Sequence, residues 1–316
     1  MLSSRKKITF IIPYFGKNFP KYFPLFLNSV KYNPDYDFLC FTNIVYKKTV
    51  PSNFKIIPFS LRELTTLIKE KIGINTEFDN AYKLCDLKPC YGYIFQDYIK
   101  EVDFWGHIDI DLVLGNLNHF LYDDPTLENY EVLSFRQEWL SGSFALYKNV
   151  EVVNSLFKKS KDWKRVFETP TYLGFDECSR ANIKGFSIFG ALMKGEDLLS
   201  IPTEIESFTK VLLKSNLYVH FKTLIKESID YGMLIKYEKG TIEVFKSGKS
   251  NLTNKERFLH YHYISEKRSK FFKYPNWDIS SDKFYISKYG FHKNITHYYL
   301  RVLSVKLDLV IKKLFK

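Results

Sequence analysis

The chain has 316 residues, of which 45% are apolar and 26% charged, and its formal net charge is +12. These values exclude collagen, low-complexity disorder and a multi-pass membrane protein, and the length allows one large α/β domain to bury a core without disulfides. The positive charge is compatible with a nucleic-acid or anionic-membrane partner. However, Lys, Asn, Ile, Tyr and Phe are all abundant, as an AT-rich genome would produce, so the charge alone identifies no partner.

The four cysteines, Cys40, Cys85, Cys90 and Cys178, form no C-x-x-C pair and have no histidine at zinc spacing. This pattern predicts buried thiols in a reducing compartment. The first apolar run, 8–12, ends at Pro13 and is too short for a signal peptide or a membrane span. We therefore expect the protein to stay in the cytoplasm.

The N-terminal half begins as β-α-β, which predicts an α/β fold with a doubly wound, mostly parallel sheet flanked by helices. Hydrophobic periodicity predicts strands at 8–12, 36–41, 54–59 and 102–114, and helices at 22–31 and 79–100. Pro89 is expected to kink the second helix or to start a new one.

In the C-terminal half the predicted segments become shorter. We expect strands at 131–135, 141–147, 218–221, 233–237 and 241–245, and helices at 151–159 and 296–316. The last helix has leucines along one face and lysines largely opposite. It is expected either to lie on an anionic membrane or to pack on the domain or on another subunit.

The sequence FWGHIDIDLVLG, 104–115, contains the clearest candidate site. Two carboxylates two residues apart in one strand, Asp109 and Asp111, would share a face and repel one another if buried. A divalent cation, Mn²⁺ or Mg²⁺, would compensate them, because these ions prefer carboxylate oxygens. The alternative is a solvent-exposed strand end with two ordinary acids.

Several motifs in order resemble a bacterial family of GT-A-like glycosyltransferases that is largely known as a domain of unknown function. The motifs are Pro13-Tyr14-Phe15-Gly16, Asp86-Leu87-Lys88-Pro89, Asp103 to Asp111, Leu140 to Asn149 and Gly174-Phe175-Asp176-Glu177. The resemblance covers about 8–267. It implies a GT-A-like domain at 1–267 and an extension at 268–316 that ends in the basic amphipathic helix.

The resemblance also implies a function in bacterial surface polysaccharide assembly, such as capsule, O-antigen or lipopolysaccharide. A sugar would move from a nucleotide-sugar donor, with a UDP-sugar expected, to a saccharide or lipid-linked acceptor. Asp109 and Asp111 would hold the metal on the leaving diphosphate. No nucleic-acid partner is expected, and the oligomeric state is left open.

Donor-binding residues are expected in two groups. Pro13, Tyr14, Phe15 and Gly16 follow the first strand, and Thr42 and Asn43 follow the second, where open α/β sheets bind ligands. Asp86 and Lys88 precede the strand that leads to the metal residues, so they would meet a sugar hydroxyl and a phosphate. The alternatives are a packing role for Tyr14 and a surface ion pair for Asp86 and Lys88.

Acceptor-side residues are expected further along the chain. The resemblance to GT-A enzymes implies that Asp176 or Glu177 faces the acceptor hydroxyl. It would act as general base in an inverting enzyme, or would orient substrates or stabilise the oxocarbenium-like state in a retaining one. The alternative is an acidic cluster at a helix N-terminus. Ser141-Gly142-Ser143 would line the acceptor side because glycine lets backbone approach a ligand, although a tight turn also explains it.

Two histidines in one apparent strand, His260 and His262, are candidates for a third metal ligand, a role that the resemblance to GT-A enzymes implies. The sequence does not choose between them, and the alternative is a surface or core pair of histidines. Lys267 would contact the diphosphate. His107 would support the aspartates as a partner of the metal ligands. His220, His292 and His297 receive no role.

Two other classes of function are weighed against this one. A carboxylate-metal phosphohydrolase would place a D-x-D-x-T motif at the first strand, whereas that strand ends in Pro13-Tyr14. A noncatalytic protein that binds nucleic acid or a membrane surface would show exposed basic-aromatic clusters, whereas the aromatic residues here follow core spacing.

Overall fold

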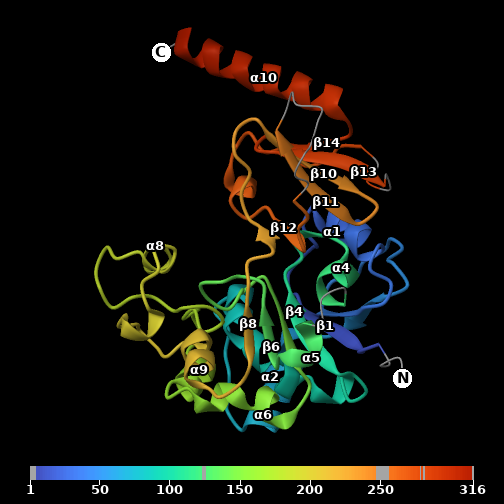
Figure 1. The fold of residues 1–316 in the computed structure, drawn as a ribbon. Coiled ribbons are helices and arrows are strands. Elements are labelled where there is room, and N and C mark those ends of the chain that lie inside the picture. The colour runs from blue at the N-terminus through green and yellow to red at the C-terminus, as the bar shows by residue number, and fades with distance from the viewer. Residues whose placement is uncertain (1–4, 123–125, 247–255, 278, 280–281, 315–316) are drawn as a thin grey trace. The chain divides into compact units, whose positions relative to one another are not determined.

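The computed structural model describes residues 5–122, 126–246, 256–277, 279 and 282–314. The chain forms two compact units from interleaved segments (Figure 1). The first unit comprises 1–19, 35–109 and 124–223, and the second comprises 20–34, 110–123 and 224–316. The predicted boundary at residue 267 stays a prediction.

The first unit is built on a mixed, mostly parallel sheet with the strand order β3-β2-β1-β4-β7-β6-β8. Its strands are β1 (Ile8–Pro13), β2 (Asp37–Thr42), β3 (Phe54–Pro58), β4 (Phe104–Ile108), β6 (Val132–Ser134), β7 (Phe144–Lys148) and β8 (Val219–Phe221). Only β7 runs antiparallel to its neighbours. The expected α/β fold class, a mostly parallel sheet flanked by helices, is confirmed.

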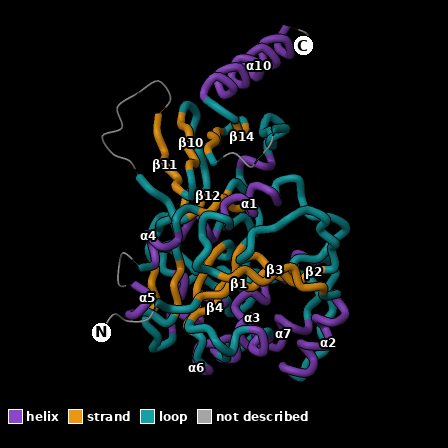
Figure 2. Tube along the Cα trace, turned by 90° about the vertical axis from the view of Figure 1, so that its right-hand side faces the viewer, coloured by secondary structure: helices purple, strands orange, loops and turns teal. Residues whose placement is uncertain are grey.

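Helices cover one face of this sheet, and Figures 1 and 2 both show α2 and α6 on the same side of the strands. The helices of the unit are α2 (Leu61–Ile72), η1 (Ala81–Cys90), α3 (Tyr91–Ile94), η2 (Gln96–Tyr98), α5 (Thr126–Asn129), α6 (Glu151–Asn154), η3 (Leu156–Lys159), α7 (Trp163–Glu168), α8 (Ile188–Leu192), η4 (Leu198–Ser200) and α9 (Phe208–Lys214). Alternation along β1 sends Ile11 into this helix-covered core, while Phe10 lies on the other face and stacks on Phe38.

The centre of the helix-covered core is Trp105 of β4, which is fully buried. Its ring stacks on Tyr147 of β7 at 4.2 Å between centroids. Its indole N–H donates to Asn154 Oδ1 at 2.7 Å, so the buried donor has a partner. These contacts fix β4, and therefore the residues that follow it, against β7 and α6.

The second unit contains two small sheets, with strand orders β11-β10-β13-β14 and β5-β12-β9. The strands are β5 (Leu112–Leu114), β9 (Ile225–Lys226), β10 (Met233–Glu238), β11 (Thr241–Lys246), β12 (His260–His262), β13 (Lys283–Ser287) and β14 (Gly290–His292), and the helices are α1 (Phe23–Val30), α4 (Leu117–Leu121), η5 (Glu266–Arg268) and α10 (Ile295–Leu314). Tyr237, Tyr261, Phe284 and Phe291 are among the aromatic residues of their shared core. No helix in the described part of the chain is long and apolar enough to cross a membrane.

Two predicted elements are wrong in their extent. The predicted strand at 102–114 is two strands, β4 and β5, which belong to different sheets, and Asp109 and Asp111 lie in the break between them. Charged side chains need polar partners, and those partners lie beyond the end of β4. The predicted helix at 79–100 is a 3₁₀ helix followed by α3, which begins two residues after Pro89.

All four cysteines are free thiols, and only Cys85 is not fully buried. The absence of disulfides among them agrees with the sequence-based expectation. Burial raises the pKa of each thiol, which keeps it protonated and unreactive at neutral pH.

Candidate functional site

The chain leaves the sheet of the first unit at the carboxyl end of β4. The backbone N–H of Asp109 donates to the carbonyl of Ser143, at 2.9 Å. Two residues earlier, the buried His107 donates from Nε2 to the carbonyl of Ser141 at 3.0 Å. Burial, with a smaller effect from the charge of Lys88, lowers the pKa of His107 to about 3, so its ring is neutral and acts as a fixed donor. These bonds hold the end of β4 against the 141–143 loop.

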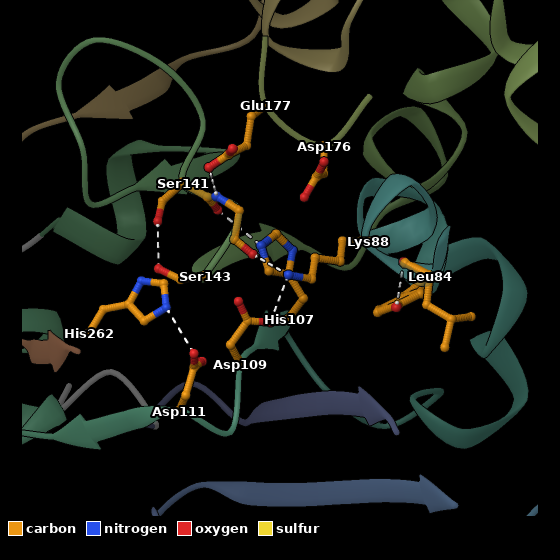
Figure 3. Close-up of polar contacts among 12 residues, drawn as sticks. Leu84, Lys88, His107, Asp109, Asp111, Ser141, Ser143, Asp176, Glu177 and His262 are labelled. Atoms are coloured by element: carbon orange, nitrogen blue, oxygen red, sulfur yellow. Dashed lines mark hydrogen bonds and ion pairs between the residues drawn. The ribbon is translucent and has the colours of Figure 1, made fainter. Parts of the chain in front are cut away.

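The ammonium group of Lys88 lies between that strand end and that loop (Figure 3). Its Nζ donates to Asp109 Oδ1 at 2.7 Å and to the carbonyl of Gly142 at 2.6 Å. Burial acts to lower the pKa of Lys88, but the surrounding negative groups, Asp109 foremost and Asp176 among them, together outweigh it and raise the pKa well above its ordinary value. Lys88 is therefore a permanently charged group beside Asp109.

Two acids face the other side of Gly142. Glu177 accepts from the Gly142 N–H at 3.2 Å, and Asp176 accepts from the Tyr172 hydroxyl at 2.9 Å. A Cβ atom at position 142 would lie 2.9 Å from both acidic side chains, so any larger residue there would force the two acids to shift. Burial raises the pKa of both carboxyls, and the neighbouring Glu177 raises that of Asp176 further. The pair therefore retains a proton to higher pH than exposed acids would.

The predicted acceptor-side serines lie in the same loop. Ser141 and Ser143 are buried, and their hydroxyl oxygens are 3.2 Å apart. The Ser141 N–H also donates to Ser134 Oγ, which ties the loop to the end of β6. The structure thus brings Ser141, Gly142 and Ser143 together with Asp176 and Glu177.

Asp86 is placed in the interior of the first unit. It is fully buried and accepts from Lys83 Nζ at 2.8 Å and from the backbone N–H groups of Leu173 and Phe175 at 2.8 and 2.7 Å. These three bonds position the segment that leads to Asp176. Sequence reasoning missed Lys83, although the three-residue spacing from Asp86 was a signal for a helical pair.

The first group of predicted donor-binding residues, 13–16 and 42–43, lies at the carboxyl ends of β1 and β2 and in the two loops that follow them. Gly16 and Asn43 exchange two hydrogen bonds, from Gly16 N–H to the side-chain oxygen and from the side-chain amide to the Gly16 carbonyl, at 3.0 and 2.9 Å. Thr42 Oγ1 accepts from the Ile44 N–H. Tyr14 stacks on Phe19. Phe15 and Thr42 are buried, and Pro13 is paired with Phe41 of β2.

In the second unit, Asp111 has two side-chain partners, the ammonium group of Lys267 and the imidazole of His262. Lys267 Nζ contacts Asp111 Oδ2, and His262 Nε2 lies 3.4 Å from the same oxygen. Burial acts to raise the pKa of Asp111, but the imidazole and the ammonium group outweigh it and hold that pKa well below its ordinary value. Asp111 is therefore ionised, and Figure 3 shows the His262 ring directed at it.

The strand register explains this arrangement. In the antiparallel pair of β12 and β5, His262 is opposite Leu112, directly after Asp111, whereas His260 is opposite Leu114. His262 is therefore the histidine of the pair that contacts Asp111. Its Nδ1 lies 3.8 Å from Glu227 Oε1, a residue that sequence reasoning missed and that no local pattern marks.

A buried carboxylate also positions Lys267. Glu266 accepts from the Ile229 N–H and from the Tyr261 hydroxyl, both at 3.0 Å. These bonds fix η5 and the lysine that follows it. The ammonium group of Lys267 also lies over the ring of Tyr22, with Nζ 5.9 Å from the ring centroid.

Comparisons with known proteins identify the family but no function. The model of a family of unknown function, DUF6625, matches residues 10–295, so the chain belongs to that family. No protein among the curated ones matches the chain.

Three solved structures are distant likenesses of the chain. A galactosyltransferase, LgtC, in complex with donor and acceptor sugar analogs is 12% identical with a TM-score of 0.30, and the match covers 51% of this chain and 64% of that one. An active-site mutant of LgtC is 10% identical with a TM-score of 0.30, covering 72% and 76%. The glycosyltransferase GlyE of Streptococcus pneumoniae TIGR4 is 13% identical with a TM-score of 0.26, covering 70% and 55%. Likenesses of this size say nothing about substrate or site.

The buried pair of Lys83 and Asp86 gives a stability prediction. We expect Lys83→Met to lower the free energy of unfolding by about 3–5 kcal/mol, because it leaves the Asp86 carboxylate buried without its counter-charge. The matched control is Lys100→Met, which removes an exposed lysine at the same three-residue spacing from Asp97. Urea unfolding measures both. If both variants lost the same free energy of unfolding, burial of the Lys83–Asp86 pair would not be the cause of the loss.

The raised pKa of Glu177 gives a pH prediction. The folded state binds more protons than the unfolded one between the ordinary carboxyl pKa and the raised one, so stability falls as pH rises through that window. Glu177→Gln keeps an acceptor for Gly142 and removes this loss. We expect the variant to be more stable than the wild type above the window and equal to it below, as measured by urea unfolding at several pH values. With Glu70→Gln, at an exposed acid of α2, no such divergence is expected. If the difference in stability between Glu177→Gln and the wild type did not change with pH, Glu177 would not have a raised pKa in the folded protein.

Proposed function

We propose that this member of the DUF6625 family is a metal-dependent glycosyltransferase. It would move a sugar from a nucleotide-sugar donor, a UDP-sugar in the first instance, to a saccharide or lipid-linked acceptor in the cytoplasm, for a bacterial surface polysaccharide. The observation that supports this most directly is the Asp109-Ile110-Asp111 segment after β4, in which each carboxylate has its own lysine partner, Lys88 or Lys267.

Chain geometry supports a shared metal site. Only Ile110 separates the two aspartates, so their Cα atoms lie within about 7 Å of one another. Asp111 also has His262 beside it. Two carboxylates and an imidazole are a ligand set that suits Mn²⁺ or Mg²⁺, and we propose that Asp109, Asp111 and His262 hold such an ion. When bound, the ion would supply Lewis-acid stabilisation of the leaving diphosphate.

The strand order supports donor binding at the same edge of the sheet. The chain proceeds from β1 to β2 and β3 on one side, and β4 then pairs with the other side of β1. Open α/β sheets bind ligands outside the carboxyl ends of the strands at such a reversal. The loops with Tyr14, Gly16 and Asn43 follow β1 and β2 there, and Asp109 follows β4. We propose that these loops bind the nucleotide.

Charge balance predicts that metal and donor bind together. The two aspartates and the two lysines are formally neutral as a set. A divalent cation and the diphosphate of a nucleotide sugar also cancel one another. Either ligand alone would leave a net charge at the site, whereas the two together restore neutrality. In this scheme Lys88 and Lys267 contact the phosphates.

We assign the acceptor side to Asp176 and Glu177. Burial shifts the pKa of these carboxyls upward, toward neutral pH. A general base that accepts the proton of an acceptor hydroxyl works best when its pKa is near the operating pH. The Gly142 backbone and the two serines beside it would form the wall of this side. In a retaining reaction the same acids would orient the acceptor and stabilise positive charge on the sugar ring. Asp86 would act indirectly, through the segment that it holds next to Asp176.

The test is a thermal-unfolding screen with UDP-, GDP-, CMP- and dTDP-sugars, each with and without Mn²⁺. A ligand that binds only the folded state at about 100 times its Kd adds about 2.7 kcal/mol of stability. We expect one nucleotide class to raise the melting temperature when Mn²⁺ is present, and Asp109→Asn, Asp111→Asn and His262→Ala to remove the shift. Asp97→Asn, at an exposed acid of the first unit, should leave it unchanged.

Three outcomes would contradict the proposal. These are no shift with any donor, a metal-dependent shift that survives all three substitutions, and release of phosphate without sugar transfer. The last would identify a phosphohydrolase. A steeply salt-dependent affinity for nucleic acid in the absence of donor binding would instead favour a noncatalytic protein.

A further inference from the structure

The helix α10 has two apolar faces, and only one of them packs on the second unit. Tyr298, Val302 and Val305 recur every three or four residues, and Tyr298 and Val305 are buried, at 5% and 1% exposure. Arg301 adds a hydrogen bond to the Phe271 carbonyl at 2.7 Å. Tyr298 and Val302 belong to one hydrophobic cluster with Tyr285 of β13, and Figure 1 shows the first part of the helix beside β13 and β14.

The second face is apolar and exposed. At 3.6 residues per turn it lies roughly opposite the packed face. Its members are all between 51% and 61% exposed, and we call them the α10 stripe: Leu300, Leu303, Leu307, Val310 and Ile311. Scattered exposed leucines are ordinary, but a continuous row of five over three turns indicates an interaction surface.

The charges of α10 are mostly positive. The helix contains Arg301, Lys306, Lys312 and Lys313 against a single acid, Asp308. Lys306 and Lys312 are exposed. The whole chain has a net charge of +12. A row of leucines with lysines beside and opposite it, on a helix that cannot cross a membrane, is typical of a helix that lies in the headgroup layer of a bilayer.

We propose that the α10 stripe docks on the surface of a bilayer that contains anionic lipids. The leucines would enter the boundary between headgroups and acyl chains, while Lys306 and Lys312 would contact anionic headgroups. Tyr299, half-exposed at the border of the stripe, has the amphipathic side chain that such interfaces favour. This inference does not depend on the proposed enzymatic function.

A second copy of the chain is a poorer occupant. The stripe is about 17 Å long and a helix is about 10 Å wide, so it offers about 170 Å² of contact against the about 800 Å² per partner of a stable interface. Pairing two α10 helices would also bring their lysines together. An anionic surface has the opposite charge and needs no matching shape.

The test is sedimentation of the full chain with vesicles of phosphatidylcholine containing about 30% phosphatidylglycerol, beside vesicles of phosphatidylcholine alone. We expect binding to the anionic vesicles that weakens with salt, and much weaker binding to the neutral ones. Leu303→Ser with Leu307→Ser should lower the partition coefficient about tenfold or more. Lys306→Gln with Lys312→Gln should lower it about fivefold per lysine.

The matched control is Leu199→Ser with Leu213→Ser, which removes two exposed leucines of the first unit and should bind like the wild type. All substituted positions are exposed, and thermal unfolding checks that each variant is folded. The proposal is overturned if no vesicle binds the protein, if the control loses as much binding as the stripe variant, or if both vesicle types bind equally. It is also overturned if the lipid-free wild type is a dimer that the stripe substitutions dissociate, because the stripe would then be a subunit interface.

Discussion

The buried ammonium group of Lys88 is the interaction on which the site of the first unit depends. It bonds to Asp109 at the end of β4 and to the Gly142 carbonyl, while the Gly142 N–H bonds to Glu177. One positive charge thus lies near three carboxylates, Asp109, Asp176 and Glu177, which come from two separate segments. Without it, those acids would repel one another in a poorly hydrated space, and the strand end, the loop and the acidic pair would separate. This requirement also explains why the 3₁₀ helix η1 stays close to the sheet.

Both units use a buried carboxylate to position a charged group of the site. In the first unit, Asp86 accepts hydrogen bonds from two backbone N–H groups in the segment just before Asp176. In the second unit, Glu266, the residue before Lys267, accepts hydrogen bonds from a backbone N–H and a tyrosine hydroxyl. Neither acid needs to touch a substrate for this role. A buried carboxylate that loses its hydrogen bonds raises the free energy of the protein strongly. Such a carboxylate therefore holds its partner loop more firmly than apolar packing alone would. The proposed chemistry therefore depends on residues that are themselves structural.

Local patterns were enough to predict β1, β2, β3 and the α/β class, because continuous apolar runs bounded by Pro, Asn and Gly are specific for buried parallel strands. The break between β4 and β5 was not predictable, since Ile110, Leu112 and Val113 continue the apolar run and only tertiary partners draw the chain out of the sheet. The choice of His262 over His260 required the register of β12 against β5. Glu227 gave no sequence signal, because its contact with His262 joins two separate segments of the chain.

The central claim is that Asp109, Asp111 and His262 bind a divalent cation together with a nucleoside diphosphate. Electron paramagnetic resonance of free Mn²⁺ tests it directly, because bound ions lose the sharp six-line signal. The account predicts weak binding of Mn²⁺ alone, tight binding of one ion per chain when UDP or another nucleoside diphosphate is added, and loss of that binding in His262→Ala. Undiminished binding in His262→Ala, or no effect of any nucleoside diphosphate on Mn²⁺ affinity, would contradict it.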